Sequence, residues 1–270
     1  MNPLSGIPAR RKWVFGATAL MLPAFVAAVV IVGGHPSPTS NGHGAAEGSS
    51  PIVAPTPSLP GARSLTSGQQ ADLQQSLARM RAEIPVTPGT SARYPAVSSQ
   101  DRQQPDLYAA AFTRQLLTQD YRTSRDQLLA WVQSESAQST EPLVVGLTPV
   151  DLRGRLALWS VQDDTGSPAI VPSRSGWAAL AERQGYTTVQ IQKVTEPVSW
   201  AGAVADGEIT DPGVTARQID AEVTLHTVDH GRAMTTRFSE ALAIQLEGPP
   251  VRGGYGFVVA GICNGAGVNE

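Results

Sequence analysis

The chain has 270 residues, a formal net charge of −3 at pH 7 and one cysteine, Cys263. A single cysteine excludes an intrachain disulfide framework, so an exported domain of this chain has to rely on its hydrophobic core. From Pro105 onward acidic side chains outnumber basic ones. This balance argues against direct nucleic-acid binding, because a face that neutralises phosphates needs positive charge.

Residues 13–33 form an uncharged apolar run directly after a basic cluster at residues 10–12. As a helix the run would span roughly 31 Å, enough to cross a hydrocarbon core of about 30 Å. By the positive-inside rule, residues 1–12 form a cytoplasmic tail and the chain after the run is exported. The alternative is a cleaved signal peptide, whose apolar region usually covers only about 7–15 residues. We therefore expect a single-pass protein of the cell membrane.

Residues 34–68 are rich in proline, glycine and serine and contain no aromatic residue, which predicts an extended linker. In the next segment, residues 69–104, an apolar pattern at helical spacing ends at Pro85 and consists of Leu73, Leu77, Met80 and Ile84. The pattern fits either a coiled coil or an amphipathic helix that lies on the main domain. The second is favoured, because two heptads are too few for a reliable coiled-coil prediction.

Residues 105–270 are predicted to form the exported domain, with Pro105 at the first position of a helix. The apolar stripe of this helix consists of Tyr108, Phe112, Leu116 and Leu117. A second helix is expected to begin near Thr123 or Ser124, either of which can cap it. Its apolar side consists of Leu128, Leu129, Trp131 and Val132. We interpret both aromatic stripes as core and not as a cofactor site.

The following segment gives weaker signals. Residues 150–161 fit either a short helix or an edge strand, and residues 163–166 predict a turn. Ser173 or Ser175 is expected to cap a helix that carries Trp177, Leu180 and Ala181. Gly185 is expected to end that helix in the left-handed conformation.

After Gly185 the apolar period changes from helical to two. Alternating apolar residues occur in four series, which are Val189 and Ile191; Ile219, Ala221, Val223 and Leu225; Met234, Phe238, Leu242, Ile244 and Leu246; and Tyr255, Phe257, Val259 and Cys263. Residues 229–231 predict a hairpin turn between the second and third series. Such alternation is typical of an antiparallel sheet with one buried face. Helices followed by antiparallel strands predict an α+β fold.

Few residues offer chemistry. His226 and His230 have the spacing H-x-x-x-H, but the glutamate of a zinc-protease motif is missing, which favours solvated strand residues. Strict alternation would place Glu240 on the buried face, where a raised pKa would suit a general base. A β-bulge near Ser239 and Glu240 would return the carboxylate to solvent and is the favoured interpretation. We therefore predict no catalytic, cofactor-binding or metal-binding residue, no cofactor and no enzyme.

The order of apolar anchor, proline-rich linker, helix pair and long strands resembles the TcpC-type conjugative transfer proteins. Through them it resembles the bitopic scaffold subunit of type IV secretion systems. The resemblance covers the anchor and residues 108–263, and its most distinctive part is the helix pair YAAAFTRQLLTQDYRTSRDQLLAW. It implies a nuclear-transport-factor-like (cystatin-like) cone, in which a curved antiparallel sheet wraps a long helix. The Asn-Pro-x-Gly turn of the scaffold subunit is absent, and the most similar segment is Asp211-Pro212-Gly213, so no dimer site is carried over.

The resemblance implies a non-enzymatic, membrane-anchored assembly or scaffold subunit of a conjugative, type IV secretion-like DNA-transfer apparatus. The implied partners are other membrane proteins of the apparatus, with no direct nucleic-acid contact and with homo-oligomerisation left open. One alternative is an enzyme or ligand-binding protein of the same cone fold, in which Glu240 would work in an apolar pocket. Another is an accessory protein of a different exporter, because the Mce-associated membrane proteins of actinobacteria have a similar layout.

Overall fold

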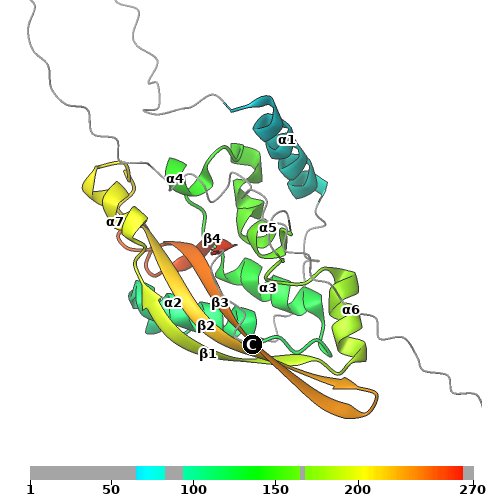
Figure 1. Cartoon of the computed structure of the whole chain (residues 1–270). Coiled ribbons are helices and arrows are strands. Elements are labelled where there is room, and N and C mark those ends of the chain that lie inside the picture. The colour runs from blue at the N-terminus through cyan, green and yellow to red at the C-terminus, as the bar shows by residue number, and fades with distance from the viewer. Residues whose placement is uncertain (1–64, 83–93, 165–167, 264–270) are drawn as a thin grey trace, which may run out of the picture.

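The computed structural model describes residues 65–82, 94–164 and 168–263. Most of the helices come before the first strand in the chain, and several of them pack on a four-stranded antiparallel sheet of strand order β1-β2-β3-β4 (Figure 1). The α+β prediction is therefore confirmed. The membrane helix predicted at residues 13–33 and most of the predicted linker lie outside the described residues. Within the described ranges, no helix is long and apolar enough to cross a membrane.

The sheet is a meander of two short outer and two long inner strands. The strands are β1 (Tyr186–Thr195), β2 (Val214–Asp229), β3 (Arg232–Glu247) and β4 (Gly256–Ile262). The predicted hairpin turn between β2 and β3 is confirmed, because His230 and Gly231 both have positive φ (47° and 76°) and Asp229 pairs with Arg232. In Figure 1 this hairpin projects beyond the ends of β1 and β4, next to the end of α6 (Arg174–Glu182), where Val228 N donates to Arg183 O at 2.7 Å.

All of the described helices precede β1 in the chain except one, which connects β1 to β2. They are α1 (Ser67–Ala82), η2 (Asp101–Gln103), α2 (Pro105–Leu117), α3 (Arg125–Glu135), α4 (Pro142–Val145), η3 (Val150–Arg155), α5 (Leu156–Gln162), α6 (Arg174–Glu182) and α7 (Val198–Ala205). Both helices of the predicted pair are present, α2 with Pro105 in its first turn. Residues 150–161 are helical, which decides between the two alternatives for that segment. The short helix α7 was not predicted.

The core lies between the inner face of the sheet and the helices α2, α3 and α5. Helix α2 packs against β1 and β2, and α5 packs against β4. The predicted core residues Phe112, Leu116, Trp177, Val223 and Phe257 are buried. Phe238 packs against the same cluster but stays partly exposed, because it lies nearer to the hairpin end of β3.

Helix α1 lies on the domain. Its buried residues Leu77 and Met80 belong to one apolar cluster with Leu152, Leu156 and Trp159 of η3 and α5. Arg155 also donates hydrogen bonds from Nη1 to the carbonyls of Met80 and Arg81, at 3.2 Å and 3.0 Å. These carbonyls belong to the last turn of α1, where a cation is favourable. The structure therefore agrees with the amphipathic helix predicted to lie on the main domain.

The end of α6 corrects one prediction. Its start agrees with the sequence, since Ser173 accepts a hydrogen bond from Gly176 N at 3.2 Å. At the other end, however, the left-handed residue is Gln184 (φ 52°) and not Gly185. A Cβ on Gly185 would lie 2.8 Å from Leu180 O and 3.0 Å from Tyr121 Cδ2. Gly185 is thus required for a close approach of the chain, not for its backbone angles.

Candidate functional site

Glu240 lies in a regular part of β3. The register pairs Phe238 with Val223, Glu240 with Ala221 and Leu242 with Ile219, without any shift. The β-bulge predicted near Ser239 and Glu240 is therefore absent, and the irregularities fall instead between Ile191 and Lys193 and between Gln245 and Leu246. Unbroken alternation keeps Glu240 on the inner face, where it is partly buried, and burial raises the pKa of its carboxyl group.

The inner face of the sheet is filled by aromatic side chains. The ring of Phe112 on α2 lies 4.4 Å from that of Phe257 on β4 and 5.1 Å from that of Trp131 on α3. Tyr108 extends this stack, with its ring centroid 5.9 Å from that of Phe112. All four residues are completely or almost completely buried. The centre of the fold is therefore packed and offers no room for a substrate at these rings.

The two histidines of the H-x-x-x-H pattern have different surroundings and share no described partner. His226 stacks on Tyr186 at 4.6 Å, and its Nε2 lies 3.2 Å from Thr188 Oγ1. His230 forms the hairpin turn, and its side chain is 96% exposed. Among the described residues, no three histidine, cysteine or acidic side chains are grouped as a metal site would require.

The described residues form an open groove on the surface, at the start of β1. Its volume is about 370 Å³, and the connection between α2 and α3 supplies its other wall. The lining residues are Tyr94, Thr118, Gln119, Asp120, Arg122, Thr123, Tyr186, Thr187 and Thr188. Hollows of this size can hold one or two side chains of a partner or a small ligand.

Backbone and side-chain hydrogen bonds fix the two walls of the groove to each other. Gln119 N donates to Thr187 Oγ1 at 2.7 Å, and Thr187 N donates to Gln119 O at 2.8 Å. Asp120 and Tyr186 form an isolated antiparallel bridge. Gln119 Nε2 also donates to the Ile170 carbonyl at 3.0 Å. The groove is thus preformed, which reduces the entropy cost of binding.

A row of flat groups borders this groove. The guanidinium of Arg122 lies 5.6 Å from the ring centroid of Tyr186. The ring of Tyr186 also stacks on that of His226. Asp120 accepts two hydrogen bonds from the guanidinium of Arg122, at 2.7 Å and 2.8 Å, and this pairing raises the pKa of the guanidinium. The pair cancels its own charge, so the groove offers aromatic faces and threonine hydroxyls without a strong net charge. These groups can bind, but none of them is an activated nucleophile.

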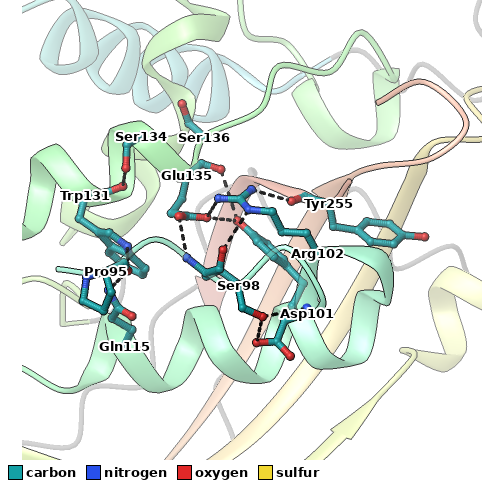
Figure 2. A network of polar contacts seen from close by, with 12 residues as sticks. Pro95, Ser98, Asp101, Arg102, Gln115, Trp131, Ser134, Glu135, Ser136 and Tyr255 are labelled. Carbon is teal, nitrogen blue, oxygen red and sulfur yellow. Dashed lines mark hydrogen bonds and ion pairs between the residues drawn. The ribbon is translucent and has the colours of Figure 1, made fainter. Parts of the chain in front are cut away.

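A second polar centre lies inside the fold (Figure 2). Glu135 is buried and accepts hydrogen bonds from Arg102 Nη2 at 2.6 Å, Tyr108 Oη at 3.1 Å and Val97 N at 3.1 Å. Arg102 also donates to the carbonyls of Val97 and Tyr255, at 3.2 Å and 3.0 Å. Burial raises the pKa of Tyr108 far above its usual value, and the Glu135 carboxylate adds to this shift. Each of these polar groups has a hydrogen-bond partner, so the network fastens residues 97–102 to α3 and to the residue before β4.

Glu141, the residue before α4, fixes the connection between α7 and β2. Glu141 Oε2 accepts hydrogen bonds from Thr210 N, Thr210 Oγ1 and Asp211 N, each at 2.9 Å. Glu247, at the end of β3, is also buried, and burial raises the pKa of its carboxyl group. Sequence reasoning missed these residues and the Arg102–Glu135 pair. No periodic pattern links partners that are far apart in the chain.

Comparisons with family models, curated proteins and solved structures find no match to this chain.

Proposed function

We propose that the chain is a membrane-anchored, non-enzymatic assembly subunit of a conjugative, type IV secretion-like apparatus, acting through protein contacts outside the membrane. The observation that carries the proposal is the position of the groove on the surface of the domain. Aromatic rings fill the inner side of the sheet around Phe112, whereas the groove opens on the surface between Tyr94 and Tyr186. Catalysis on a small substrate favours an enclosed pocket that excludes water, whereas an open groove suits a segment of another protein.

The lining of the groove indicates what it could bind. Tyr186 is 38% exposed and presents a ring held between Arg122 and His226. Exposed, rigid aromatic side chains are enriched at the energetic centres of protein interfaces. Because Asp120 already neutralises Arg122, the groove favours an uncharged aromatic or proline side chain over an acidic one. We therefore propose that a segment of a neighbouring apparatus protein places such a side chain against Tyr186.

The test is DNA transfer from donor cells that lack the chain. We expect transfer to be lost and to be restored by the wild-type chain. Tyr186→Ala should restore transfer at least tenfold less well while the chain accumulates normally, because the ring is partly exposed and adds little to the core. Val198→Ala is the matched control, since Val198 is 89% exposed on α7. Unchanged transfer after deletion of the chain would contradict the proposal.

A further inference from the structure

The hairpin half of β3 has an open edge. Strand β4 pairs with β3 only from Leu242 to Glu247, and the ladder ends where Cys263 N donates to Ala241 O at 2.7 Å. Residues 232–240 pair with β2 on one side and with no described residue on the other. This open edge contains no proline, no lysine and no shift in its register with β2. It therefore lacks three of the features by which proteins usually protect a strand edge.

The direction of the free backbone groups follows from the same hydrogen bond. In an antiparallel strand the N–H and C=O groups of successive residues point to alternate sides. Because the Ala241 carbonyl points towards β4, the odd-numbered residues from Ala233 to Ser239 direct their backbone groups to the open edge. The open stretch, residues 232–240, is about 30 Å long at 3.3 Å per residue.

The side chains on the inner face of this stretch are unusual for an exposed strand. Met234 is 50% exposed, and Phe238 is only partly buried. Glu240 is partly buried, and burial raises the pKa of its carboxyl group. None of the ion pairs among the described residues includes this carboxylate. Arg232 lies on the same face at the other end of the stretch and is exposed. An acid and a base thus flank two apolar side chains.

We propose that a second copy of this chain covers the open edge, with the two β3 strands antiparallel about a two-fold axis at Thr236. In this register Arg232 lies opposite the partner's Glu240, and Met234 lies opposite the partner's Phe238. Thr236 lies opposite the partner's Thr236, and each of the two pairs named above occurs twice because of the two-fold symmetry. Opposite charges and apolar pairs at facing positions are the contacts that stabilise antiparallel strands. The same pairing compensates the carboxylate of Glu240 and covers Met234.

The backbone fits this register as well. Thr235 faces the partner's Arg237 and Ala233 faces the partner's Ser239, and all four residues are odd-numbered. Their N–H and C=O groups therefore meet, which gives roughly eight hydrogen bonds across the axis. Moving the axis by one residue, to Arg237, would set two arginines against each other and Met234 against the partner's Glu240. The Thr236 register is thus specified by charge and by apolar pairing. This assembly does not depend on the proposed function.

Disulfide cross-linking of the full-length chain in the membranes of expressing cells tests the proposal. Thr236→Cys is placed in a Cys263→Ser background, so that the introduced thiol is the only one in the chain. Facing residues in a non-hydrogen-bonded antiparallel pair have Cα atoms about 4.5 Å apart, within the range of a disulfide. We expect mild oxidation to convert most of this variant into a covalent dimer. Thr235→Cys is the control, because residue 235 faces residue 237 and its yield should be at least tenfold lower.

A charge exchange checks the register. Arg232→Glu, added to Thr236→Cys, places two carboxylates opposite each other and should lower the dimer yield at least fivefold. Adding Glu240→Arg restores opposite charges and should recover the yield. Circular dichroism of each variant shows whether the fold is retained. Equal yields at positions 235 and 236, no dimer at either, or a dimer only after removal of residues 264–270 would overturn the proposal. The last result would assign the edge to the chain's own carboxyl terminus.

Discussion

Replacement of Arg102 by methionine tests the buried network most severely. The change removes three hydrogen bonds from Arg102, to Val97 O, Tyr255 O and Glu135 Oε2. It also leaves the carboxylate of Glu135, whose side chain is 0% exposed, without its only cationic partner among the described residues. Breaking one side of a buried ion pair costs about 3–5 kcal/mol. Because Tyr108 and Val97 still donate to Glu135, we expect a loss near 3 kcal/mol.

The assay is urea unfolding of the full-length chain in mild non-ionic detergent, followed by tryptophan fluorescence. Adding Glu135→Gln to Arg102→Met removes the uncompensated charge and should recover part of the free energy of unfolding. Arg174→Met is the matched control. Arg174 pairs with Asp126, both side chains are well exposed, and its loss should cost less than about 0.5 kcal/mol. A loss below about 1 kcal/mol for Arg102→Met would refute the argument that this network fastens residues 97–102.

Three further predictions concern packing, pH and backbone geometry. In the same urea assay, Phe112→Ala should cost about 3–5 kcal/mol because its ring is fully buried, whereas the partly exposed Phe238→Ala should cost less than half as much. At protein concentrations low enough to keep the chain monomeric, Glu240→Gln should stabilise the fold at pH 7. Because burial raises the pKa of Glu240 in the folded chain, its charged form destabilises the fold at any pH above the pKa of the unfolded chain. The stability gained from glutamine should therefore vanish below about pH 4. An equal gain at pH 3 would contradict this explanation. Gly185→Ala should cost about 1–3 kcal/mol, because the added methyl group would lie too close to Leu180 and Tyr121. Gln184→Gly should be neutral or should stabilise the fold by up to about 1 kcal/mol, because residue 184 has positive φ. The reverse order of the two effects would refute the close-approach explanation.

The parts of the fold that local pattern determines could be predicted from the sequence. The stripe of Tyr108, Phe112 and Leu116 predicts α2, because helical spacing and burial coincide there. The alternation from Ile219 to Leu225 predicts β2 and its inner face, and His230-Gly231 predicts the hairpin. These signals depend only on neighbours along the chain.

Features that depend on distant residues could not be predicted in this way. Arg102 lies in a polar segment, and nothing near it indicates its ion pair with Glu135. The helix α7 has a short apolar sequence that fits no single period, and Trp200 is buried only because Val214, Ala216 and Val258 lie beside it. The prediction of a bulge at Glu240 was wrong because it assumed that a local change in the strand would return the carboxylate to solvent. The structure instead keeps the register and leaves Glu240 at an open strand edge.

The groove was missed for the same reason. Its two walls, the α2–α3 connection and the start of β1, are joined by the bridge between Asp120 and Tyr186. The one signal in the sequence is the cluster of polar residues at 118–123 between two strongly apolar helices. Such a cluster is typical of any connection between two helices and does not by itself indicate a groove.

Photo-cross-linking from the groove tests the central claim, that the chain acts through protein contacts outside the membrane. A photoreactive amino acid replaces Tyr186 in donor cells that carry the complete transfer apparatus, and Val198 is replaced in the control. We expect an adduct between position 186 and another membrane protein of the apparatus, and no such adduct at position 198. An adduct at neither position, or the same adduct at both, would contradict it.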